Sequence, residues 1–130
     1  MCVGPARGGK PVCLPMHTFS VNCDRRSDAF VVTVRGELDL AALPRLQPVV
    51  NDAVRSGLPR VVIDLCGVSF MDSTGLGLLM NALRRLEYLD RRLLIACVDG
   101  PVRRVFALTR LSSQFELFES AGDALAAKAA

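Results

Sequence analysis

The sequence RVVIDLC at residues 60–66, followed by DSTGLG at residues 72–77, decides the fold. RVVIDLC is an apolar, β-branched run of the kind found in central strands that are covered on both faces. Beyond DSTGLG the leucines Leu76, Leu79, Leu83 and Leu86 recur at helical spacing, which predicts a long amphipathic helix. We therefore expect Leu79 and Leu83 to be core residues.

The residues before this stretch predict two more strands and a helix. Residues 18–23 alternate polar and apolar side chains, and residues 29–35 form a second apolar run. A turn-forming segment separates the two, so an antiparallel hairpin is expected. Apolar residues at helical spacing from Leu43 to Val54 then predict a helix that ends near Gly57.

The residues after it continue the alternation of strands and helices. Residues 92–98 predict a buried strand, residues 101–108 a short helix, and residues 115–118 a short last strand. The Ala-rich end at residues 121–130 is a further helix candidate. This order predicts an α/β fold with a mainly parallel sheet.

Length and composition indicate one globular domain. The chain has 130 residues, of which 51% are hydrophobic and 22% charged. We expect a flexible N-terminal arm at residues 1–15, the folded domain at residues 16–120, and an Ala-rich C-terminal tail at residues 121–130.

The charge pattern argues against nucleic acid and membranes as partners. The 16 Lys and Arg residues are scattered among 13 Asp and Glu residues, and there is no Trp and a single Tyr. No apolar run is long enough for a spanning helix, and residues 1–15 lack a signal-peptide core. These features predict a cytoplasmic protein.

The cysteines do not indicate a metal site. There are five of them, Cys2, Cys13, Cys23, Cys66 and Cys97. None form a C-x-x-C pair, and His17 is the only histidine, so neither a metal nor any other cofactor is predicted. Cys66 and Cys97 lie in apolar runs and are interpreted as small buried side chains. An odd number without framework spacing suits a reducing cytosol.

Ser73 has two interpretations at the start of the predicted helix. Asp and Ser are both common N-caps, so the residue can be purely structural. The same position suits a phosphate, because helix N-terminal amides stabilise an anion. Gly75 and Gly77 are likewise open to two interpretations, close packing within the fold or close approach of a partner.

Catalysis is not predicted. Met71 occupies the first glycine position of the G-x-S-x-G hydrolase motif, and His17 is remote in the sequence. Asp39 and Asp72 could be paired as a general acid and base, but nothing in the sequence indicates a substrate pocket for them. We assign no catalytic residue and expect a protein that is not an enzyme.

Three segments together resemble the STAS domains of anti-sigma-factor antagonists. They are GELD at residues 36–39, VIDL at residues 62–65 and FMDSTGLG at residues 70–77. The resemblance covers residues 17–120. It implies a single STAS-like domain with a four- to five-stranded, mostly parallel sheet, an N-terminal antiparallel hairpin and three or four flanking helices.

The resemblance also implies a switch in bacterial transcription. The unphosphorylated protein would bind an anti-sigma factor that is also a serine kinase and so release the sigma factor. Phosphorylation of Ser73, with Thr74 as the alternative acceptor, would abolish binding, and a metal-dependent serine/threonine phosphatase would reset the switch. The implied partner-binding residues are Asp39, Asp72, Ser73, Thr74, Gly75 and Gly77.

Two other functions stay open at the level of sequence. The chain could be a STAS subunit of another assembly, such as a sensory complex or a transporter accessory. It could also be a small-ligand or nucleotide-binding STAS domain, because glycines lie near a helix N-terminus.

Overall fold

The computed structural model describes residues 19–111 and 113–127. Its elements, in chain order, are β1 (Ser20–Arg25), β2 (Ala29–Leu38), the 3-10 helix η1 (Leu40–Ala42), α1 (Leu43–Arg55), β3 (Arg60–Met71), α2 (Ser73–Tyr88), β4 (Arg92–Ala96), α3 (Pro101–Leu108), β5 (Glu116–Phe118) and α4 (Ala121–Ala126). The expectations for the arm at residues 1–15 and for His17 fall outside the described residues.

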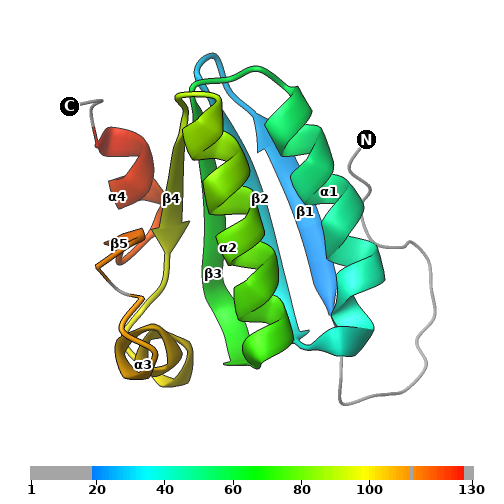
Figure 1. Cartoon of the computed structure of the whole chain (residues 1–130), viewed down its shortest axis with the longest axis vertical. Coiled ribbons are helices and arrows are strands. Elements are labelled where there is room, and N and C mark those ends of the chain that lie inside the picture. The colour runs from blue at the N-terminus through cyan, green and yellow to red at the C-terminus, as the bar shows by residue number, and fades with distance from the viewer. Residues whose placement is uncertain (1–18, 112, 128–130) are drawn as a thin grey trace.

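The strands form one five-stranded sheet in the order β1-β2-β3-β4-β5 (Figure 1). β1 and β2 pair antiparallel, and their turn is closed by the Arg26 amide donating to the Ala29 carbonyl oxygen at 2.7 Å. The other strands pair parallel. The predicted α/β fold, with its hairpin and mostly parallel sheet, is confirmed.

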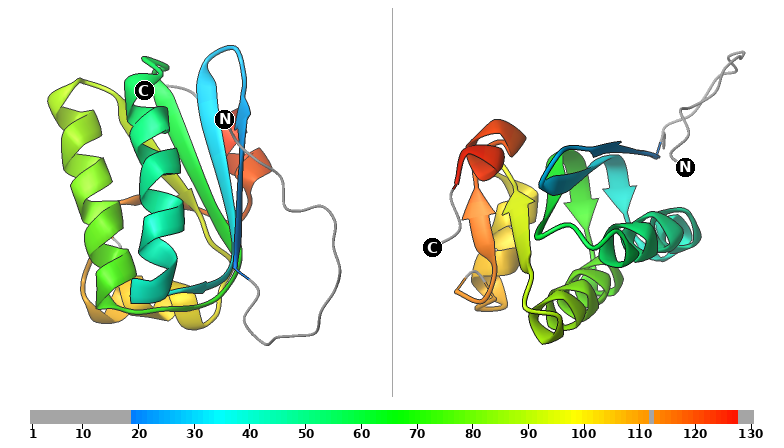
Figure 2. Two further views of the ribbon diagram at one scale, coloured as in Figure 1. Left: turned by 90° about the vertical axis from the view of Figure 1, so that its right-hand side faces the viewer. Right: turned by 90° about the horizontal axis from the view of Figure 1, so that it is seen from above.

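Helices cover both faces of the sheet (Figure 2). α1 and α2 lie on one face, and α4 lies on the other. The alternation of β3 supplies both cores, because Ile63 joins the larger cluster with α1 and α2 whereas Val62 packs with Ala124 of α4. Leu79 is fully buried and Leu83 is 6% exposed, so both predicted core positions are confirmed.

β3 is longer than the sequence pattern indicates. We expected a strand ending at Cys66, but β3 continues to Met71. Two register shifts between β2 and β3 each accommodate one extra residue of β3. The first follows Asp64, whose Oδ1 accepts from the Cys66 amide at 2.9 Å, and the second lies between Val68 and Phe70. The extension carries the end of β3 as far as the end of β2.

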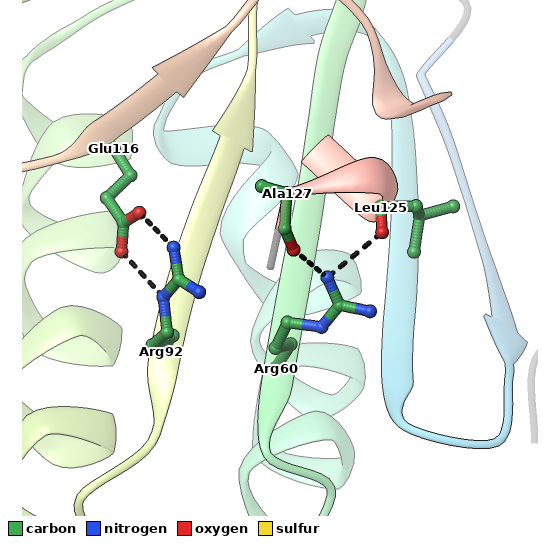
Figure 3. Close-up of polar contacts among 5 residues, drawn as sticks. All are labelled: Arg60, Arg92, Glu116, Leu125 and Ala127. Carbon is green, nitrogen blue, oxygen red and sulfur yellow. Dashed lines mark hydrogen bonds and ion pairs between the residues drawn. The ribbon is translucent and has the colours of Figure 1, made fainter. Parts of the chain in front are cut away.

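Two arginines fasten the C-terminal elements (Figure 3). Arg92 of β4 forms a two-pronged ion pair with Glu116 of β5, and its Nε lies 3.0 Å from Glu116 Oε2. Arg60 of β3 donates through Nη1 to the carbonyl oxygens of Leu125 at 3.0 Å and Ala127 at 2.6 Å. Residues 125 and 127 are thereby held against β3.

Candidate functional site

The carboxyl ends of β2 and β3 lie side by side where α2 begins (Figure 1). Leu38 is the last residue of β2 and pairs with Met71, the last residue of β3. The Asp72 amide donates to the Leu38 carbonyl oxygen at 3.3 Å. Asp39 and Asp72, which are distant in sequence, therefore follow two neighbouring strand ends. We call residues 36–42 and 69–77 the Ser73 end of the sheet.

Asp72 caps α2. Its Oδ1 accepts hydrogen bonds from the amides of Thr74 at 2.9 Å and Gly75 at 3.1 Å. These amides belong to the first helical turn, which has no carbonyl partners of its own. The interpretation of Ser73 as the cap is therefore wrong, and Asp72 performs that role one residue earlier.

Ser73 is the first residue of α2 and is exposed. Among the described residues its hydroxyl makes no hydrogen bond, although its neighbour Asp72 is bonded on both its backbone and its carboxylate. Thr74 is only half-exposed, and its amide is taken by Asp72. The two hydroxyls thus differ in accessibility, with Ser73 the more open.

Gly75 fits against Leu38. A Cβ atom at residue 75 would lie 2.8 Å from Leu38 Cγ, 3.0 Å from the Leu38 carbonyl oxygen and 3.0 Å from Met71 Cγ. Real Cβ atoms do not tolerate such contacts, so only glycine lets α2 start this close to the end of β2. Gly75 is buried and serves internal packing, and the implied role in direct partner contact does not suit it.

Gly77 differs from Gly75. It is exposed, and a Cβ atom there would meet nothing within 4 Å. It lies four residues after Ser73, so both residues share one face of α2. The fold itself gives no steric reason for a glycine at this helical position, where alanine has the higher helix propensity.

Asp39 lies in the turn between β2 and η1 and is half-buried. Its carbonyl oxygen accepts from the Ala42 amide at 3.0 Å, while its side chain makes no capping hydrogen bond. Gly36, three residues earlier, has a φ of +105°, a backbone conformation that residues other than glycine rarely adopt. Gly36 lies at a register shift within β2, which continues to Leu38, and only Asp39 of the GELD motif follows the strand.

Two exposed apolar side chains at the Ser73 end were not singled out from the sequence. Leu40 of η1 is 68% exposed, and Phe70 of β3 is 48% exposed. Exposed large apolar groups beside a functional position are typical of protein interaction surfaces. The alternation of buried and exposed residues along β3 breaks at residues 68–71, where Val68 and Met71 are buried and the two residues between them are exposed. This break could have drawn attention to Phe70.

The described residues hold no group of three His, Cys, Asp or Glu side chains placed to bind a metal ion. Among them there is also no helix of the length and apolarity that crossing a membrane requires. Cys66 and Cys97 are free thiols, and Cys23 is disulfide-bonded. Burial, followed by the hydrogen bond and charge of Asp64, raises the pKa of the Cys66 thiol to about 11, so it is a poor nucleophile at neutral pH.

Comparison with known proteins places this geometry in a family. The family model described as "STAS domain" matches residues 20–124. The chain is 37% identical over 92 residues to an anti-sigma-B factor antagonist of Staphylococcus epidermidis, covering 71% of this chain and 85% of that protein. It is 36% identical over 90 residues to the protein of the same name from Staphylococcus aureus, covering 69% and 83%.

Solved structures agree with this assignment. A crystal structure of an anti-sigma factor antagonist from Mycobacterium paratuberculosis superimposes with a TM-score of 0.77 at 29% identity, covering 83% of this chain and 92% of that one. The family match at residues 20–124 contains the sheet and the Ser73 end. The chain belongs to the STAS-domain family of anti-sigma-factor antagonists, which are not enzymes.

Proposed function

We propose that this chain is a phosphorylation-controlled switch in bacterial transcription. In its unphosphorylated form it binds an anti-sigma factor that is also a serine kinase, and the sigma factor is released. Phosphorylation of Ser73 abolishes this binding. The observation that supports the proposal is the exposed, unengaged Ser73 hydroxyl at the start of α2, beside the exposed apolar residues Leu40 and Phe70.

Ser73 is a better acceptor than Thr74. A kinase must bring the attacking oxygen in line with the transferred phosphoryl group, which requires an accessible hydroxyl. Ser73 is exposed, whereas Thr74 is half-exposed and its backbone is held by Asp72 at 2.9 Å. The phosphate therefore goes to Ser73 in this proposal.

A phosphate on Ser73 blocks docking without unfolding α2. It adds about −1.5 to −2 charges at pH 7. The helix start tolerates an anion because the positive end of the helix dipole lies there. The amides of residues 74 and 75 are already bonded to the Asp72 carboxylate, so the phosphate gains few new donors. Burying it against an apolar partner surface is then costly.

The proposed contact surface contains Asp39, Asp72, Ser73, Thr74 and Gly77, to which we add Leu40 and Phe70. Gly75 supports this surface from inside. A metal-dependent serine/threonine phosphatase would remove the phosphate. Neither the kinase nor the phosphatase centre belongs to this chain.

We place this cycle in the cytoplasm, where sigma factors act. A reducing cytoplasm keeps cysteines as thiols, so Cys23 is expected to be a thiol in the cell. Alkylation of freshly lysed cells without reductant, followed by peptide mapping, tests this. Full protection of Cys23 from alkylation would argue against a cytoplasmic location.

The phosphorylation step is tested by intact-mass spectrometry. The purified chain is incubated with ATP and candidate anti-sigma kinases of the same genome, alongside Ser73→Ala and Thr74→Val. We expect one added phosphate in the wild type and in Thr74→Val, and none in Ser73→Ala. Phosphate on Thr74 alone would contradict the assignment of the acceptor.

The binding step is tested by calorimetry with the kinase that modifies the chain. The unphosphorylated chain should bind, and the phosphorylated chain and Ser73→Asp should not. Equal affinity of the two forms would rule out the switch.

A further inference from the structure

We infer that Leu38 is a positioning residue that fixes where Ser73 is presented relative to Asp39. The inference rests on the proposed function of Ser73 as the acceptor. It concerns a buried side chain at the end of β2, which does not itself touch the partner.

Leu38 restrains α2 through two separate contacts. Its carbonyl oxygen accepts the Asp72 amide at 3.3 Å, which fixes the residue before Ser73. Its side chain fills the space in which a Cβ atom of residue 75 would lie, 2.8 Å from Cγ. Leu38 therefore contacts α2 at Asp72, before Ser73, and at Gly75, after it.

Asp72 restrains the backbone on the other side of Ser73. Its carboxylate holds the amides of Thr74 and Gly75 at 2.9 Å and 3.1 Å, so the backbone after Ser73 is tied to the residue before it. Ser73 is left as an exposed residue whose covalent neighbours cannot shift independently.

Leu38 also determines where Asp39 starts. It is fully buried and paired with Met71, and Asp39 follows it directly in the chain. The positions of the Asp39 carboxylate and the Ser73 hydroxyl are therefore both set by Leu38. Docking surfaces built this way lose little entropy on binding, and an acceptor held in place reacts faster once bound.

Gly75→Ala tests the inference because the added methyl group must push α2 away from Leu38. The assay measures phosphorylation of Ser73 by an anti-sigma kinase that modifies the wild-type chain. We expect kcat to fall at least tenfold while KM changes less than threefold, since the docking residues remain but the hydroxyl is displaced.

Leu38→Ala is the second test. It removes the side chain against which α2 starts, so kcat should fall as it does in Gly75→Ala, while the surface residues stay unchanged. Leu86→Ala is the control for stability alone, because Leu86 is fully buried towards the other end of α2. Its kcat should equal that of the wild type under conditions in which the chain is folded.

Two outcomes overturn the inference. The first is a kcat for Gly75→Ala that matches Leu86→Ala, and the second is a kcat for Leu38→Ala that matches Leu86→Ala. If no kinase modifies the wild-type chain, the proposed function fails, and the placement is judged from the backbone amide NMR signals of Asp39 and Ser73. The Ser73 signal should move in Leu38→Ala and the Asp39 signal in Gly75→Ala, each more than in Leu86→Ala, and unmoved signals would refute the positioning role.

Discussion

Arg60 Nη1 lies 2.6 Å from the carbonyl oxygen of Ala127, so a side chain of β3 closes the end of α4. The Arg60 side chain is only 11% exposed, and its Nη2 also lies 3.0 Å from Asp28 Oδ2 in the hairpin turn. One guanidinium thus ties together the hairpin, the central strand and the last helix.

Arg60→Ala is expected to loosen α4. Hydrogen bonds from a charged donor are worth about 1.5–3 kcal/mol each, and part of this is recovered when the carbonyls meet water, so we expect a loss of about 1–3 kcal/mol. Urea unfolding gives the free energy, and hydrogen exchange should rise in residues 121–127 first. Arg55→Ala is the control, because its pair with Asp52 is long at 3.7 Å and exposed. Similar losses in both variants would refute the special role of Arg60.

Asp72→Ala should destabilise the chain by about 1 kcal/mol, the usual cost of losing an N-cap side chain. Ser73→Ala should leave the free energy of unfolding unchanged, because the Ser73 hydroxyl makes no hydrogen bond among the described residues. Chemical unfolding of the two variants gives the comparison. A larger loss for Ser73→Ala than for Asp72→Ala would show that the cap is misassigned.

Gly75→Ala and Gly77→Ala should change stability in opposite directions. At residue 75 the new Cβ meets Leu38 at 2.8 Å, and overpacking of this kind costs about 1–3 kcal/mol. At residue 77 the space is open, and alanine gains up to about 1 kcal/mol through helix propensity. Thermal unfolding measures both.

Gly77→Ala should nevertheless weaken binding of the anti-sigma factor, since a methyl group is added to the exposed face that carries Ser73. Calorimetry with the unphosphorylated protein tests this. A variant that is both more stable and equally tight in binding would remove Gly77 from the contact surface.

The Cys66 thiol links stability to alkaline pH. Its pKa rises from the ordinary value of 9.0 to about 11 in the folded chain, because burial and Asp64 disfavour the thiolate. Between about pH 9 and 11 the folded state keeps the thiol proton that the unfolded state loses. The contribution of Cys66 to the free energy of unfolding is therefore complete below about pH 9 and is lost as the pH rises to about 11. The difference in urea midpoint between the wild type and Cys66→Ala should shrink over that interval. A constant difference would contradict the raised pKa.

The periodicity of apolar residues was sufficient to predict the order of strands and helices. The run at residues 60–66 and the leucine stripe from Leu76 to Leu86 carry strong patterns, because each must fill a core against several neighbours. The hairpin was also predictable, because it depends on a turn and two strands that are adjacent in the sequence. These elements appear in the structure with boundaries shifted by a few residues.

Features that depend on distant partners were not predictable. The apolar run ends at Cys66, yet β3 continues to Met71 because two register shifts against β2 accommodate the extra residues. The choice between Asp72 and Ser73 as the cap was open, since both residue types cap equally well. The role of Gly75 became visible only once Leu38, 37 positions earlier in the chain, was seen against it.

Every strand of this sheet bonds to the strand that precedes it in the chain, so no strand has to be threaded between two others. A nascent polypeptide can therefore extend the sheet at a single growing edge as it leaves the ribosome. All residues of the Ser73 end are synthesised before residue 78, well ahead of β5 and α4. The last helix to be made, α4, is then fastened by Arg60 to a sheet whose Ser73 end has already been synthesised.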